Sequence, residues 1–127
     1  MRLNANGSID STFNLWSGLT GSPDSVLGKI RVLDNGQILI SGVFSAVNGL
    51  NRMNIARLNI NGSVDPAFNA GDFSAGPGGW SGAGVELLND GRLLIYQYFA
   101  SVGGVPRRNL ARLLSNGSID SSFNTDG

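Results

Sequence analysis

The chain has 127 residues, of which 19 are glycine, and its nine basic and nine acidic residues cancel to a formal net charge of zero. A neutral chain lacks the electrostatic attraction that draws proteins to nucleic acid or to anionic membranes, so neither is an expected partner. The sequence contains no cysteine and no histidine, which excludes disulfides, thiol nucleophiles, Ser-His-Asp triads and histidine metal sites. We therefore expect no metal and no cofactor, and no apolar run approaches the roughly 20 residues of a membrane span.

One thirteen-residue pattern occurs three times at constant spacing. It reads RLNANGSIDSTFN at 2–14, RLNINGSVDPAFN at 57–69 and RLLSNGSIDSSFN at 112–124, so consecutive copies lie 55 residues apart. A fixed period of this size marks a repeat architecture. We therefore divide the single repeat domain 1–127 into a half unit (1–14), a first repeat unit (15–69), a second repeat unit (70–124) and a tail (125–127).

Each full unit predicts the same succession of strands and turns. The first unit begins with a loop rich in glycine and serine at 15–28, followed by strands at 29–34 and 37–44, a loop at 45–53 and a hairpin at 54–69. The second unit repeats these elements at 84–89, 92–99, 100–108 and 109–124. Because Ile38, Leu39 and Ile40 are apolar on both faces, we expect that strand to be covered on both sides. No stretch has helical periodicity, so each unit should hold four short antiparallel strands.

The repeated hairpin contains Asn-Gly-Ser between two alternating runs, which predicts a tight turn. A three-residue loop at 61–63 would set Ile60 opposite Val64 and would make Arg57 a diagonal neighbour of Asp65. Repetition at one structural position indicates a structural role. The residues so assigned are Arg2, Arg57, Arg112, Asp10, Asp65, Asp120, Phe13, Phe68 and Phe123.

Four-stranded units that cannot bury themselves alone predict an all-β fold of blades of the β-propeller kind. Propellers close with about 4–8 blades, and two and a half units are too few. We therefore expect closure by oligomerisation, with a homotrimer as the first expectation. The pattern is equally compatible with a trimeric β-prism.

Two segments carry a resemblance to a known family. LDNGQILISGVFSAVNG at 33–49 and NIARLNINGSVDPAFN at 54–69 resemble the delta-sixty repeats of predicted β-propeller units, and the pattern covers nearly the whole chain. Such repeats occur in bacterial surface and secreted proteins and in phage tail or fibre proteins, generally without a known enzymatic role. The second unit departs from the pattern, because Gln97 replaces the glycine found at Gly42 in the first.

Five aromatic residues are candidates for contact with a ligand or partner. Trp16 and Trp80 have no counterpart at the 55-residue offset, Phe73 shares a glycine-rich loop with Trp80, and Tyr96 and Tyr98 point to one face. Aromatic side chains on loops of a rigid β scaffold commonly contact sugars or proteins. The alternative is that they cover sheet edges or fill a subunit interface.

These observations predict a non-enzymatic structural or adhesive component of a phage virion, as a tail fibre or accessory fibre subunit. Its expected partners are other copies of itself, other virion or surface proteins, and a cell-surface glycan. The N-terminal residues are already repeat sequence and lack a signal-peptide core, as expected of a virion protein assembled in the cytoplasm or of a piece of a longer chain. The alternative is a secreted or cell-surface bacterial β-propeller fragment that binds protein or glycan.

Overall fold

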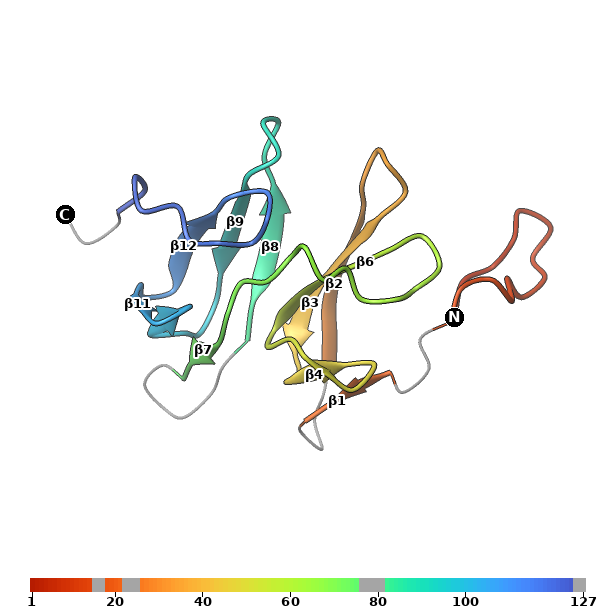
Figure 1. Cartoon of the computed structure of the whole chain (residues 1–127), viewed down its shortest axis with the longest axis horizontal. Coiled ribbons are helices and arrows are strands. Elements are labelled where there is room, and N and C mark those ends of the chain that lie inside the picture. The colour runs from red at the N-terminus through yellow and green to blue at the C-terminus, as the bar shows by residue number, and fades with distance from the viewer. Residues whose placement is uncertain (15–17, 22–25, 76–81, 125–127) are drawn as a thin grey trace.

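The computed structural model describes residues 1–14, 18–21, 26–75 and 82–124, and within these ranges the chain forms strands, turns and loops without a helix (Figure 1). The described strands group into four antiparallel sheets of three strands each. None of the four closes into a barrel. The predicted all-β fold of tandem, blade-like units is therefore confirmed.

Each repeat unit has one larger sheet at its centre. In the first unit β3 (Ile38–Val43) lies between β2 (Val26–Val32) and β6 (Ile55–Leu58). In the second unit β9 (Leu93–Tyr96) lies between β8 (Gly84–Leu87) and β12 (Leu110–Leu113). The strands β6 and β12 have bounds 55 residues apart, and Figure 1 shows the two larger sheets side by side.

Two smaller sheets occupy segments that the sequence had assigned to loops. One joins β1 (Leu19–Thr20), β4 (Ala46–Val47) and β5 (Leu50–Asn51). The other joins β7 (Phe73–Ser74), β10 (Ser101–Val102) and β11 (Val105–Pro106). Two-residue strands are too short to show the alternation by which a strand is recognised, which is why the sequence did not reveal them.

The register of the repeated hairpin differs from the prediction. Leu58 pairs with Val64, and the N–H of Asn59 donates to the carbonyl of Ser63 at 2.8 Å, so the loop is 60–62 rather than 61–63. Gly62 fixes this frame because it takes φ +87°, the left-handed conformation that closes a three-residue turn. The predicted pairing of Ile60 with Val64 is therefore wrong, and Ile60 lies in the turn with 61% of its surface exposed.

The same register recurs in the other two hairpins, where Leu3 pairs with Ile9 and Leu113 with Ile119. The outermost strand of each unit is thus a single bridge rather than a full strand. Arg57 and Asp65 face each other directly, since the N–H of Asp65 donates to the carbonyl of Arg57 at 2.8 Å.

Two hydrophobic cores lie on opposite faces of the first unit's larger sheet. The inter-unit core lies toward the second unit and includes Leu39, Ile55, Phe68, Val85, Leu93, Ile95, Phe99 and Leu113. The N-terminal core lies toward the half unit and includes Ile38, Ile40, Phe44, Ala56, Leu58 and Val64, with Phe13 packed against it. Because Leu39 enters one core and its two neighbours enter the other, β3 is covered on both sides, as predicted.

The departure at Gly42 has a structural counterpart. A Cβ at Gly42 would lie 2.1 Å from the carbonyl oxygen of Val26, so only glycine permits the strands to approach as they do. At the matching position Gln97 takes φ +130°. The strand β9 accordingly ends at Tyr96, while β3 continues to Val43.

Candidate apolar binding site

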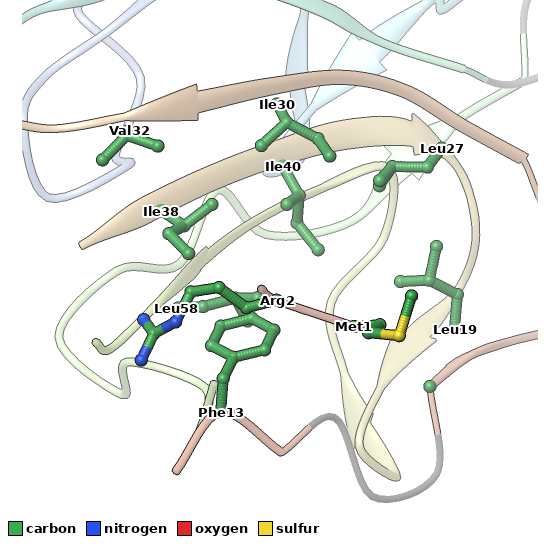
Figure 2. A pocket seen from close by; sticks show the side chains of 11 residues that line it. Met1, Arg2, Phe13, Leu19, Leu27, Ile30, Val32, Ile38, Ile40 and Leu58 are labelled. Atoms are coloured by element: carbon green, nitrogen blue, oxygen red, sulfur yellow. The ribbon is translucent and has the colours of Figure 1, made fainter. Parts of the chain in front are cut away.

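The main candidate site is an apolar cavity of about 550 Å³ on the N-terminal face of the first unit's larger sheet (Figure 2). Its walls come from β2, β3 and β6 on one side and from the half unit and β1 on the other. The lining residues are Met1, Arg2, Phe13, Gly18, Leu19, Leu27, Ile30, Val32, Ile38, Ile40 and Leu58.

The cavity exists because one blade position is half empty. In the second unit the same face is filled, since Leu39 and Ile55 of the first unit lie in one core with Val85. Val85 is fully buried, whereas Ile30, its equivalent in the first unit, is 56% exposed. The half unit 1–14 matches 56–69 and brings no strand equivalent to β3. The cavity therefore lies where such a strand would pack.

The chemistry of this cavity is that of apolar binding. Arg2 is the one ionisable side chain in its lining, and the Nε atom of Arg2 donates to Asp10 at 2.7 Å. The Arg2 guanidinium lies 4.8 Å from the centre of the Phe13 ring. An apolar side chain or ligand would find van der Waals contact inside and one cation at the rim.

The residues that repeat in the three hairpins form three equivalent clusters. We call the hairpins first (1–14), second (56–69) and third (111–124). In each, an arginine Nε donates to an aspartate oxygen at 2.7 or 2.8 Å, and its guanidinium lies 4.6–5.0 Å from a phenylalanine ring centre. The clusters are Arg2–Asp10–Phe13, Arg57–Asp65–Phe68 and Arg112–Asp120–Phe123.

Hydrogen bonds hold these aspartates in the charged form. The hydroxyl and N–H of Thr12, together with Arg2, lower the pKa of Asp10 to about 2. Burial acts to raise the pKa of Asp65, but the donors around it outweigh burial and lower that pKa below its ordinary value. The pKa of Asp120 is lowered chiefly by the hydroxyl of Ser122. The three carboxylates are thus engaged in holding the hairpins.

Sequence reasoning missed one further pair of partners for these carboxylates. The side chain of Gln37 donates to Asp65 at 2.8 Å, and Arg92 donates to Asp120 at 3.3 Å. Gln37 and Arg92 occupy equivalent positions in the two units. The shared offset was the available signal, but the change from an amide to a guanidinium concealed it.

The aromatic candidates do not gather at the cavity. Phe73 corrects the expectation, because it is buried and packs edge-on against Phe99 with ring centres 5.6 Å apart. Tyr96 and Tyr98 are exposed on the second unit. Trp16 and Trp80 lie outside the described residues, as does the tail 125–127.

A smaller cleft of about 320 Å³ lies between the units and includes Tyr96 in its lining, together with Lys29 and Gln97. The Lys29 ammonium lies 6.0 Å from the centre of the Tyr96 ring and pairs with Glu86. Gly84 makes room for that ring, because a Cβ there would lie 2.6 Å from it. This cleft offers one aromatic face with a cation beside it.

The described residues include no helix long and apolar enough to cross a membrane. They also hold no group of three or more acidic side chains placed to bind a metal ion.

Comparison with sequence families gives one match, to the family described as "Domain of unknown function (DUF5122) beta-propeller". The match covers 1–13, 33–68 and 88–123, which together make up more than half of the chain. These segments contain the three hairpins and the central strand of each larger sheet. No curated protein and no solved structure matches the chain.

Proposed function

Since the chain belongs to the DUF5122 β-propeller family, we propose that it is a non-enzymatic structural or adhesive component of a phage virion, as a tail fibre or accessory fibre subunit. The observation that carries this proposal is the engagement of the repeated carboxylates. Each is bonded to an arginine and to the main chain of its own turn, so the charged residues that recur in the sequence hold strands and hairpins together.

The resemblance to delta-sixty repeats supports the virion assignment, because phage tail and fibre proteins are among those that carry them. The open apolar cavity gives further support, since an assembling subunit must present surfaces that other subunits cover. In this role the partners are other copies of the chain and neighbouring virion proteins, and the site of action is outside the cell.

A secreted or cell-surface bacterial propeller fragment that binds protein or glycan is the second candidate. It is favoured by Tyr96 and Tyr98, which are exposed on the second unit. Tyr96 also lines the cleft that contains Lys29. An aromatic face beside a charged side chain is suited to contact with a sugar ring and its hydroxyls.

Mass spectrometry of particles purified from a culture that carries the gene tests the first proposal. We expect the chain to copurify with intact virions and to stay with the tail fraction when tails are separated from heads. Recovery from the cell surface or the medium, with none in the particles, would overturn the virion assignment. Loss of glycan binding in Tyr96→Ala and Tyr98→Ala variants would then support the second candidate.

A further inference from the structure

The three hairpins form a stack in which each makes the same contact with the next. The N–H of Asn14 donates to the carbonyl of Asn61, and the N–H of Asn69 donates to that of Asn116, both at 3.0 Å. The arginines repeat this pattern, since Nη1 of Arg2 donates to the carbonyl of Ile60 at 2.5 Å and Nη1 of Arg57 to that of Ser115 at 2.8 Å. The stack therefore has a direction, with donors facing one way and acceptors the other.

The turn glycines record how closely the hairpins approach. A Cβ on Gly62 would lie 2.8 Å from the main chain of Asn14, and one on Gly117 would lie 2.8 Å from that of Asn69. Gly7 is the equivalent residue of the first hairpin and has the same left-handed backbone, with φ +83°. Nothing lies within 4 Å of a Cβ built there. The first hairpin thus has the shape that receives a neighbour and receives none.

The first hairpin also leaves its acceptors and apolar face open. Among the described residues, no hydrogen bond reaches the carbonyls of Ala5 and Asn6, which correspond to those of Ile60 and Asn61. Leu3 is 53% exposed, whereas its equivalent Leu58 is 1% exposed.

The third hairpin presents the complementary surface at the other end of the molecule. Arg112 bonds to Asp120 and Ser122 through Nε and Nη2, and within the described residues its Nη1 meets no carbonyl of a following hairpin. The ring of Phe123 is only half-buried, whereas that of its equivalent Phe68 is fully buried. Figure 1 shows the first and third hairpins at opposite ends, so they do not meet within one chain.

We propose that a second copy of this chain stacks its third hairpin on the first hairpin, repeating between chains the contact that joins consecutive hairpins within one chain. Arg112 of one copy then donates to the carbonyl of Ala5 in the other, and Phe123 covers Leu3 and Ile9. The contact joins two different surfaces, so it is heterologous, and it produces a ring if the rotation closes and a fibre if it does not. It stands whether or not the protein belongs to a virion.

Substitution of Gly7 tests this contact without disturbing the fold. Asparagine tolerates a left-handed backbone, and Gly7→Asn meets no atom of its own chain, but its Cβ would collide with the main chain of an incoming third hairpin. Gly104→Asn is the matched control, because Gly104 also has a left-handed backbone with φ +78° and open space around its Cβ, yet it lies outside the hairpins. Circular dichroism verifies that both variants are folded.

Light scattering coupled to size exclusion, over a range of concentrations, gives the mass of each particle. We expect the wild-type chain and Gly104→Asn to grow beyond the 13.3 kDa of one copy. We expect Gly7→Asn to raise the dissociation constant more than about tenfold, as steric overpacking predicts. A wild-type chain that stays monomeric, a Gly7→Asn variant that assembles normally, or equal losses in both variants would overturn the proposal.

Cross-linking provides a second test that does not depend on Gly7. The chain has no cysteine of its own, so Asn6→Cys and Asn124→Cys introduce single thiols at positions equivalent to the bonded pair Asn61 and Asn14. Residues joined in this way lie within reach of a disulfide. A mixed dimer that forms on oxidation of the two variants together supports the contact, and its absence contradicts it.

Discussion

Arg57 joins two hairpins, because its Nε donates to Asp65 in its own hairpin while its Nη1 donates to the carbonyl of Ser115 in the next, each at 2.8 Å. Arg112 makes the equivalent pair with Asp120, but within the described residues it reaches no following hairpin. The two arginines therefore separate the stability that arises within a hairpin from the stability that arises between hairpins.

Substitution of Arg57 by lysine should lower the free energy of unfolding by about 1–3 kcal/mol, because an ammonium cannot reproduce the fork of hydrogen bonds or the stacking on Phe68. Arg112→Lys removes the intra-hairpin contacts alone and should have a smaller effect. Urea denaturation of both variants measures the difference. Equal losses would show that the bond to Ser115 contributes nothing.

Truncation of Phe68 to alanine should lower the free energy of unfolding by about 3–5 kcal/mol, because the ring is completely buried in the inter-unit core. Phe13 occupies the same position in the first hairpin but lies beside the open cavity. Phe13→Ala should therefore have a clearly smaller effect in the same urea titration. The packing of the inter-unit core would be wrong if the two variants lost the same stability.

Substitution of Gly42 by alanine should also destabilise the fold, by about 1–3 kcal/mol, since the new methyl group would overlap the carbonyl of Val26. Gly28 lies on the facing strand, where a Cβ would come no nearer than 3.4 Å to Ser41. Gly28→Ala is thus the control and should leave the melting temperature nearly unchanged. Similar melting temperatures for the two variants would contradict the close approach of β2 and β3.

Acid should destabilise the protein through its hairpin carboxylates. The pKa of Asp10 is lowered to about 2, and that of Asp65 is lowered as well, while unfolded aspartate titrates near about 3.9. Because the folded values are lower, this contribution is fully present above about pH 4 and is lost as the pH falls toward about 2. Thermal unfolding across this range should show the decline, and Asp65→Asn should make it shallower. A melting temperature that does not change below pH 4 would contradict it.

The apolar cavity should bind an amphiphilic dye. Anilinonaphthalene sulfonate offers aromatic rings for the walls formed by Ile30 and Ile40, and a sulfonate for Arg2 at the rim. We expect its fluorescence to rise with the native protein and to fall back in Ile30→Asp. Ile9→Asp is the control, because Ile9 is exposed outside the cavity lining. Equal fluorescence in the two variants would place the dye elsewhere.

The period of 55 residues predicted much of the fold because equivalent positions have equivalent surroundings. It placed β6 and β12 at matching bounds, and the apolar run from Ile38 to Ile40 predicted a strand covered on both sides. The hairpin register was not predicted, because two three-residue loops differ by one position and the left-handed backbone of Gly62 selects between them. Alternation of apolar residues alone carries no information about that choice.

The candidate site was harder to predict than the fold. Ile30 and Val32 have the same alternating pattern as Val85 and Leu87, yet only the second pair faces a complete neighbouring sheet. Whether a strand face is buried or open depends on what packs against it, and this is a property of the assembled units rather than of the strand. Phe73 shows the converse, since its loop position indicated exposure and its burial against Phe99 comes from a distant segment.

The unequal filling of the two cores has a consequence for how the molecule opens. The inter-unit core is enclosed by both units, whereas the N-terminal core is closed on one side only by the half unit. Segments with fewer buried contacts open at lower free energy and exchange their amide protons sooner. Protection should therefore rise along the chain from the first hairpin to β9 and β12. Unfolding would then start at the N-terminal end, and the second unit would be the last part to lose its structure.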